Sequence, residues 1–211
     1  MIAVVDYGLG NIGSIINAMG KFGIKAIKTN NPQELFQADA LIFPGDGAAG
    51  KAMKNLKEGK LIKPIRAFIS SGRPFLGICL GMQILLSFSE EGNVQCLNII
   101  KGKVKKFNAG LKVPQIGWNQ VRLQSSEFRV QNERKKIKNF FKNIPDGSYF
   151  YFINSFYCEP GDKSIVFAET EYGEKFCSVF IKNNITGVQF HPEKSGEIGL
   201  RLLKNFTEVT C

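Results

Sequence analysis

The sequence predicts an α/β fold of three layers, in which a mostly parallel central sheet carries helices on both faces. Short apolar runs alternate with helical patterns through the first half of the chain, and this alternation is typical of a parallel sheet covered on both sides. The second half is strand-rich and ends in one helical pattern. Because the sequence contains no repeat, low-complexity tract or linker, we expect residues 1–211 to form a single domain.

The first half is expected to contain four strands, each stopped by a polar or glycine-rich turn. Their ranges are 2–6, 24–28, 40–43 and 74–78. Apolar positions that recur every 3 or 4 residues predict helices, the first of them capped by Asn11. The helical ranges are 12–19, 49–56, 61–69 and 82–88. Sites in such sheets form beyond the carboxyl ends of the strands, so the loops at 7–11, 44–50 and 79–81 should share one rim.

The second half contains six short strand patterns before its closing helix. The strands are expected at 104–107, 119–123, 149–153, 165–168, 176–181 and 186–190, and the helix at about 195–206. Ile198, Leu202 and Phe206 give that helix one apolar face.

Composition and charge exclude several classes of protein. No apolar run reaches the roughly 18 residues of a membrane helix, and residues 1–6 lack the basic start of a signal peptide, so a cytoplasmic protein is expected. The net charge is +10. Its basic residues form small groups, such as 101–106 and 134–138, which favours solvated faces over a nucleic-acid surface. A basic surface can also meet an acidic protein partner.

Five cysteines are present, at positions 79, 96, 158, 177 and 211. Their number is odd, no two are spaced C-x-x-C, and the chain has a single histidine. A disulfide framework and a metal site are therefore not expected. Reduced thiols in a reducing compartment are the simpler interpretation.

Gly8-Leu-Gly-Asn-Ile-Gly13 fits the G-x-G-x-x-G pattern, follows a strand and opens a helix, as a dinucleotide-binding fingerprint requires. The fingerprint also needs an acidic residue at the end of the second strand, whereas this chain has Lys28-Thr-Asn-Asn31 there. A helix cap at Asn11 and glycines for a tight turn explain the segment without a ligand. We therefore expect no dinucleotide and no other cofactor.

Cys79 lies between an apolar strand and a helical pattern in Gly77-Ile-Cys-Leu-Gly81, which has the form of a nucleophile elbow. The flanking glycines permit a sharp turn that lifts the sulfur beyond the end of the sheet. The start of a helix also favours the thiolate, which is the reactive form. A buried structural cysteine is the alternative, and the two glycines argue against it.

The only histidine, His191, can supply the imidazole that a thiolate nucleophile needs. It can take the thiol proton and return it to a departing amine. Glu193 lies two residues further on and can orient the ring as the third member of a triad. The alternative for this segment alone is a packed histidine beside a solvent-exposed glutamate. The elbow at Cys79 favours the triad.

A tetrahedral intermediate needs backbone N–H groups around its oxyanion. The Leu80 amide directly follows the nucleophile. The Pro44-Gly-Asp-Gly47 loop can present a second amide, because glycines let the backbone approach a ligand closely and flip. Taken alone, this loop is equally consistent with a tight turn that has no chemical role.

Three of these segments together resemble the class I, triad-type glutamine amidotransferases. They are Pro44-Gly-Asp-Gly47, Gly77-Ile-Cys-Leu-Gly-Met-Gln83 and Gln189-Phe-His-Pro-Glu193. Four further segments, at 6–12, 116–119, 149–152 and 191–195, make the chain similar to the glutaminase subunits of imidazole glycerol phosphate synthases. The resemblance covers nearly the whole chain.

The resemblance implies that L-glutamine is hydrolysed to glutamate and ammonia through a thioester on Cys79. His191 would act first as base and then as acid, with Glu193 orienting it. The ammonia would pass to a (β/α)8-barrel cyclase subunit in a heterodimer, which forms imidazole glycerol phosphate and aminoimidazole carboxamide ribotide in histidine biosynthesis. Glutaminase turnover would be weak until that partner binds its nucleotide substrate.

Matching positions also imply roles for other residues. Gln83 and Glu91 would hold polar groups of the substrate. Contacts to the oxyanion and the substrate would come from Gly45, Asp46, Gly47, Leu80, Ser155 and Phe156, and the residues near the partner interface would be Asn11, Trp118, Asn119 and Lys194.

The chain departs from the family pattern at three positions. Gln115 and Asn154 stand where the family often has histidine, and Asp46 replaces a small apolar residue in the oxyanion loop. An Asp side chain can bond to local amides and favour one state of a loop that is thought to reorganise on activation. Two alternatives stay open: a related glutaminase that serves another synthase, such as one making amidines on surface sugars, and a catalytically inactive binding subunit.

Overall fold

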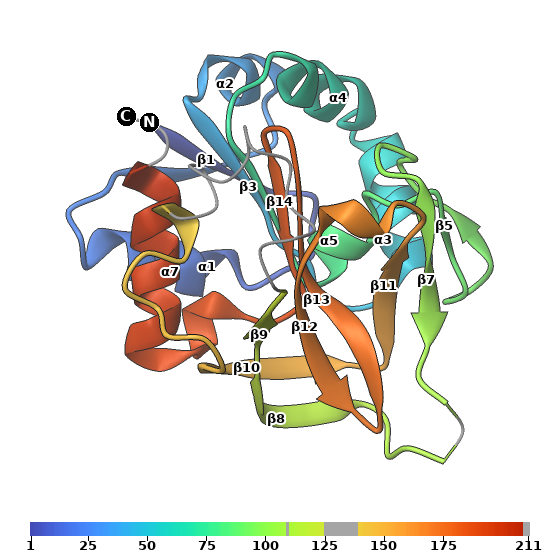
Figure 1. Ribbon diagram of the computed structural model, residues 1–211. Coiled ribbons are helices and arrows are strands. Elements are labelled where there is room, and N and C mark those ends of the chain that lie inside the picture. The colour runs from blue at the N-terminus through green and yellow to red at the C-terminus, as the bar shows by residue number, and fades with distance from the viewer. Residues whose placement is uncertain (109, 125–138, 209–211) are drawn as a thin grey trace.

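A twelve-stranded sheet runs through the middle of this computed structural model, which describes residues 1–108, 110–124 and 139–208 (Figure 1). Its strands are β1 (Ile2–Val5), β2 (Ala26–Thr29), β3 (Ala40–Phe43), β4 (Phe75–Ile78), β5 (Phe88–Ser89), β6 (Val94–Gln95), β7 (Gly102–Lys106), β9 (Arg122–Leu123), β11 (Phe156–Pro160), β12 (Val166–Tyr172), β13 (Glu174–Lys182) and β14 (Ile185–Val188). A second, two-stranded sheet pairs β8 (Gln115–Gln120) with β10 (Tyr149–Asn154) in antiparallel fashion.

The large sheet changes character along its width. Its order is β2-β1-β3-β4-β14-β13-β11-β7-β5-β6, with β12 and β9 attached beside β13. All neighbours from β2 to β14 are parallel, whereas β13 is antiparallel to β14, β11 and β12. The predicted parallel sheet is thus formed mainly by the first half of the chain, and the strand-rich second half extends it.

Helices cover both faces of the sheet, so the predicted three-layer α/β class is confirmed (Figure 1). They are α1 (Ile12–Gly20), α2 (Pro32–Gln37), α3 (Ala49–Glu58), α4 (Ile62–Ser70), α5 (Leu80–Gln83) and α7 (Gly196–Glu208), with the 3-10 helices η2 (Lys163–Ile165) and η3 (Pro192–Lys194).

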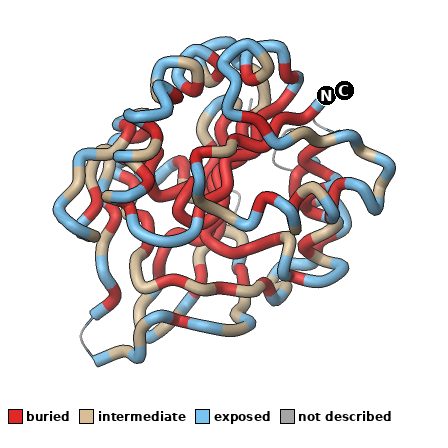
Figure 2. The backbone as a smooth tube through the Cα atoms, turned by 180° about the vertical axis from the view of Figure 1, so that it is seen from behind, coloured by how far each residue is buried: buried red, intermediate tan, exposed pale blue. Residues whose placement is uncertain are grey.

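Alternating side chains of β1 show why both faces are apolar. Ile2 and Val4 join one buried cluster, which also contains apolar residues of α1 and α7. Ala3 and Val5 join another, which contains apolar residues of α2, α3 and α4. Because successive residues of a strand point to opposite faces, an uninterrupted apolar strand is buried on both sides. Figure 2 shows this buried backbone, in red, gathered at the centre of the molecule.

The helix expected at 82–88 is wrong in its position and length, because α5 begins at Leu80 and ends at Gln83. The carbonyl oxygens of the following residues, 84–86, accept from backbone amides of the segment 97–100. Those bonds replace the ones that would continue the helix. The sequence predictions also missed α2 and β11, of which β11 starts two residues after β10 ends.

A glycine substitution tests the close packing behind Cys79. A Cβ atom at Gly81 would overlap the carbonyl oxygen of Phe43 in the neighbouring strand. We therefore expect Gly81→Ala to lower the free energy of unfolding by about 3 kcal/mol, the upper end for overpacking. The matched control is Gly13→Ala in α1, where a Cβ meets nothing within 4 Å. It should leave stability unchanged or raise it by about 0.5–1 kcal/mol. Urea unfolding measures both, and equal midpoints for the two variants would contradict this packing.

Candidate active site

Cys79 occupies the sharp turn between β4 and α5, as the elbow pattern predicts. Its backbone has φ 53° and ψ −114°, a conformation that side-chain-bearing residues rarely adopt. Its amide donates to the carbonyl oxygen of Val188 at 2.8 Å, which ties the turn to the neighbouring strand β14. The thiol is 7% exposed. Because α5 is only four residues long, the helix dipole expected to favour the thiolate is small here.

His191 and Glu193 form a buried pair at the end of β14. The Nδ1 atom of His191 lies 2.9 Å from a carboxylate oxygen of Glu193, whose side chain is 1% exposed. Glu193 is therefore not solvent-exposed, which rules out the alternative in which it points into water. With Nδ1 held by the carboxylate, Nε2 is the ring nitrogen left to exchange a proton with Cys79.

Three hydrogen bonds hold the turn that carries His191 against β10. The His191 amide donates to the carbonyl oxygen of Tyr151 at 2.9 Å. The Ser195 hydroxyl accepts from the Tyr151 amide at 2.9 Å and donates to the carbonyl oxygen of His191 at 2.6 Å. This closed ring of three bonds fixes the direction in which the imidazole leaves the main chain.

The electrostatics of His191 couple it to Cys79. Burial lowers the pKa of the imidazole, but the thiolate of Cys79 and the carboxylate of Glu193 outweigh it and raise the pKa to about 10. Because this value lies above the ordinary 6.5, the charged ring stabilises the fold fully below pH 6.5. That contribution is lost as the pH rises through about 10. An imidazolium beside a thiolate is the ion pair that a cysteine nucleophile uses.

A cavity of about 340 Å³ opens over Cys79, a size within the roughly 300–1,000 Å³ of small-molecule sites. It brings together most of the residues predicted from the sequence. The lining residues are Asp46, Gly47, Cys79, Leu80, Gln83, Glu91, Pro114, Ile153, Asn154, Ser155, Phe156, His191 and Lys194. Of the other predicted residues, Glu193 lies behind the imidazole. Gly45 packs under α5, where a Cβ would come within 2.8 Å of the Gly81 amide.

Hydrogen bonds from Tyr7 and Gly10 hold the loop that contains Asp46. Asp46 Oδ1 accepts from the Gly10 amide at 2.9 Å, and the Tyr7 hydroxyl donates to the carbonyl oxygen of Pro44 at 2.8 Å. Burial, with smaller contributions from Cys79 and Asp46, raises the pKa of Tyr7, so this hydroxyl stays a donor. A Cβ at Gly10 would lie 3.1 Å from the Pro44 side chain, which explains the glycine by packing. The predicted cap by Asn11 is confirmed, since its side chain accepts from Ser14.

Several polar groups of the cavity already have partners within the protein. One carboxylate oxygen of Glu91 accepts from the Ala49 amide at 2.7 Å, at the start of α3. Gln83 Nε2 donates to the carbonyl oxygen of Phe156 at 2.9 Å, and the carbonyl oxygen of Ser155 accepts from the Phe107 amide at 3.2 Å. The groups left for a ligand therefore include the Gln83 amide oxygen, the second Glu91 oxygen, the Asn154 side-chain oxygen and backbone N–H groups.

The four predicted interface residues do not all present free side chains. Trp118 is 55% exposed, and Lys194 is exposed at the mouth of the cavity. The Asn119 side chain instead donates to the carbonyl oxygen of Glu171 at 2.9 Å. Asn11 caps α1. Two of the four are thus engaged in holding the fold itself.

Gln189, Ser195 and Tyr7 contribute to the site but were not assigned a role from the sequence. Gln189 Nε2 lies 3.6 Å from Cys79 Sγ, and Ser195 closes the bonds around His191. Gln189 and Ser195 stand inside the motif around His191, so their place in the motif was a usable signal. Tyr7 also stands inside a segment that carries the resemblance, 6–12, but no pattern in that segment indicated that its hydroxyl would hold Pro44, which is far away in the sequence.

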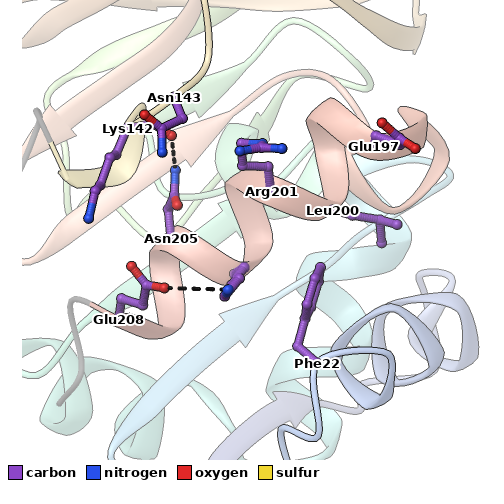
Figure 3. Close-up of a pocket in the computed structure, with 9 residues that line it drawn as sticks. Phe22, Lys142, Asn143, Glu197, Leu200, Arg201, Asn205 and Glu208 are labelled. Atoms are coloured by element: carbon purple, nitrogen blue, oxygen red, sulfur yellow. Dashed lines mark hydrogen bonds and ion pairs between the residues drawn. The ribbon is translucent and has the colours of Figure 1, made fainter.

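A larger cavity, of about 520 Å³, lies along α7 (Figure 3). Its lining includes charges of both signs, among them Lys204, which pairs with Glu208 at 3.9 Å. Asn205, also on α7, donates to the carbonyl oxygen of Lys142 at 2.8 Å. The residues that line this cavity include neither a thiol nor an imidazole, so the smaller cavity over Cys79 is the one that can perform acyl chemistry.

The predictions about cysteines, metal sites and membrane spans can be compared with the described residues. Within residues 1–108, 110–124 and 139–208, the cysteines at 79, 96, 158 and 177 are unbridged, and no group of three or more His, Cys, Asp or Glu side chains could hold a metal ion. The described helices are all too short or too polar to cross a membrane. Cys211 and the basic group at 134–138 lie outside the described residues.

The single histidine gives an unambiguous test of the coupling in this site. In the wild-type chain its ring should titrate with a midpoint near pH 10. In Cys79→Ala the midpoint should fall, because the thiolate is lost and burial then opposes Glu193 alone. The proton resonance of the ring carbon, followed by NMR in tag-free protein, measures both. Cys96→Ala, which removes a half-buried thiol at another position, is the control and should titrate like the wild type. Equal midpoints for Cys79→Ala and the wild type would show that the coupling is absent.

Comparison with known proteins shows the family of this chain. The family model for glutamine amidotransferase class-I matches residues 3–209. The imidazole glycerol phosphate synthase subunit HisH of Dehalococcoides mccartyi is 44% identical over 210 residues, which cover 99% of this chain and 97% of that protein. The protein of the same name from Chlorobaculum tepidum is 45% identical over 211 residues, covering 99% and 100%.

Solved structures support the fold. A crystal structure of a glutamine amidotransferase superposes with a TM-score of 0.74 at 18% identity, covering 100% of this chain and 99% of that one. The structure of PurLQS from Thermotoga maritima gives a TM-score of 0.73 at 17% identity, covering 99% and 97%. Together with the family match and the full-length relatives, they establish that this chain belongs to the class-I glutamine amidotransferases.

Proposed function

We propose that this chain is the glutaminase subunit of an imidazole glycerol phosphate synthase and supplies ammonia for histidine biosynthesis. The observation that carries the proposal is the full-length similarity to HisH subunits, at 44% and 45% identity. The arrangement of Cys79, His191 and Glu193 around one cavity supports it. These residues supply the nucleophile, the proton carrier and the orienting carboxylate that the reaction needs.

The positions of these groups support a two-step reaction. The Cys79 sulfur attacks the side-chain amide carbon of L-glutamine, and His191 carries the thiol proton to the departing nitrogen as ammonia leaves. The acyl group then remains on the sulfur as a thioester. Water attacks this thioester with His191 as base, which releases glutamate and restores the thiol. Glu193 keeps the ring oriented and stabilises its charged form in both halves.

The free polar groups of the cavity are suited to an amino acid. Gln83 has both N–H bonds engaged, with Phe156 and Gln189, so only its oxygen can accept from the substrate's ammonium group. The second carboxylate oxygen of Glu91 can do the same, since the first one is bound to Ala49. Because the carbonyl oxygens of Ser155 and Phe156 are engaged, these residues contribute through their N–H groups.

The oxyanion is assigned to the amides of Leu80 and Gly47. Leu80 begins α5, where helical N–H groups have no partner within the helix. Gly47 lines the same cavity and has φ +87°, a conformation that glycine adopts without strain. Gly45 allows this loop to pack on α5. The bond from Gly10 to Asp46 holds the loop in one position, so Asp46 acts on the oxyanion through the loop.

The cyclase partner, a (β/α)8-barrel subunit in a heterodimer, is assigned to the outer face of the β8–β10 sheet. This face is apolar: Ile116 is 64%, Trp118 55% and Tyr149 54% exposed. Ile153, which pairs with Ile116 across the sheet, lines the cavity over Cys79. A partner seated here would cover the cavity mouth and receive ammonia directly. Trp118, Asn119, Lys194 and Asn11 are proposed to lie within or beside this interface.

The whole chain is proposed to act as one glutaminase domain in the cytoplasm. The first and last helices, α1 and α7, contribute apolar residues to the same buried cluster. Both ends of the described chain therefore depend on one core, which supports a single domain over residues 1–211.

The division of labour predicts how one substitution acts. Cys79→Ala should abolish synthesis from glutamine by the complex with its cyclase, and leave synthesis from ammonium salts at the wild-type rate. Formation of imidazole glycerol phosphate measures both reactions, with Cys96→Ala as a control that retains both. Loss of both activities would contradict the division between subunits. A glutamine-analogue electrophile should also form a covalent adduct with Cys79, which mass spectrometry can detect. If no adduct formed in the activated complex, a thioester mechanism would be excluded.

Substitution of the exposed indole tests the docking face. Trp118→Ala should weaken binding of the cyclase subunit at least about tenfold, because central aromatic residues dominate interfaces. Titration calorimetry measures the affinity. The control is Phe36→Ala, which removes another exposed aromatic ring, on α2, and should bind like the wild type. Unchanged affinity of Trp118→Ala would overturn the assignment of this face. If the wild-type chain bound tightly only to a synthase subunit of a sugar-modification pathway, the assignment of the partner would be overturned.

A further inference from the structure

Gln189 is a buried amide that contacts the nucleophile and has no role in the reaction as described above. It follows β14, and it is 0% exposed. Its Nε2 atom lies 3.6 Å from Cys79 Sγ, within reach of an N–H···S hydrogen bond. Its backbone amide donates to the carbonyl oxygen of Ser178 at 2.9 Å. The side chain therefore starts from a fixed backbone position beside the elbow.

The orientation of this amide is set by Gln83. Gln83 Nε2 donates to the carbonyl oxygen of Phe156 at 2.9 Å and to Gln189 Oε1 at 3.0 Å. If the Gln189 amide were turned over, its NH₂ group would face that of Gln83 and its oxygen would face the sulfur. The bond with Gln83 would be lost in a buried place, where two NH₂ groups would face each other at a cost, and the oxygen could not donate to a thiolate. The hydrogen-bond network therefore presents an N–H group to the sulfur.

An N–H donor acts differently on the two forms of Cys79. A thiolate accepts such a bond more strongly than a neutral thiol, because the bond is then charge-assisted. The carbonyl oxygen of Ile153 lies 3.9 Å from the sulfur and can only accept from the thiol. The other titratable groups at this cavity are Asp46, Glu91, His191 and Lys194, with Tyr7 buried nearby. Gln189 approaches the sulfur as a neutral donor whose strength does not vary with pH.

We propose that Gln189 is a positioning residue, the last member of a hydrogen-bond relay that runs from Phe156 through Gln83 to the Cys79 sulfur. Gln83 and Phe156 line the cavity, so the relay joins the wall that meets the substrate to the atom that attacks it. It favours the thiolate and fixes the direction of the sulfur. This role rests on the proposed function of Cys79 as the nucleophile.

Alkylation of Cys79 by iodoacetamide across a pH series tests the relay in the full chain. Mass spectrometry of the peptide that contains Cys79 separates this thiol from the others. In Gln189→Met, which keeps the volume but removes the N–H donor, the midpoint of the rate profile should move upward by about one pH unit, or roughly tenfold less thiolate at neutral pH. Gln189→Glu, which places a carboxylate oxygen at the sulfur, should shift it further.

The control is Ser178→Ala, which trims a fully buried side chain on the strand that pairs with Gln189. Ser178→Ala should keep the wild-type profile. If Gln189→Met acted only by loosening the packing between these strands, the profile of Ser178→Ala would shift as well. An unchanged profile in Gln189→Met overturns the relay.

A measurement on the wild-type chain covers the case in which the Gln189 variants do not fold. The side-chain N–H resonance of Gln189 in NMR spectra should shift as Cys79 ionises, and a resonance that does not respond overturns the relay equally. If iodoacetamide fails to alkylate wild-type Cys79 at any pH, the proposed nucleophile is wrong, which is a different result from an unchanged Gln189→Met profile.

Discussion

The parallel pairing of β4 with β14 is the constraint on which the site depends. Ile78 lies opposite Val188 in this pair, and the Cys79 amide continues the ladder to the carbonyl oxygen of Val188. Because parallel strands end at the same edge of a sheet, the residues that follow them meet there although they are far apart in the sequence. The thiol and the imidazole are neighbours for this reason.

The sequence was sufficient for those features that local chemistry determines. Uninterrupted apolar strands separated by helical patterns predicted the parallel layers, and glycines around a cysteine predicted the elbow. The short elements were not predictable in the same way. α5 ends after one turn because a distant segment, 97–100, takes the carbonyl groups that would extend it. No pattern within the segment itself carries that information.

The site shows the same division. Cys79, His191 and Glu193 could be predicted because their side chains have chemistry that is recognisable in isolation, and the structure places them together. Gln189 belongs to the same motif, but an amide reveals its purpose only through its neighbours. Its two partners, Cys79 and Gln83, are more than a hundred residues away in the chain. Sequence reasoning identified reactive groups and missed the neutral ones that orient them.

The bonds around Tyr151 have a consequence for how an outside contact is transmitted. Both the amide and the carbonyl group of Tyr151 are bound to the turn that carries His191. Its ring packs edge-on against the ring of Trp118, its partner in the β8–β10 sheet, with the ring centres 6.0 Å apart. A protein that binds to this aromatic pair therefore contacts the same residue that holds the turn of His191. Tyr151 thus connects the exposed ring of Trp118 to the turn that carries the His191 imidazole.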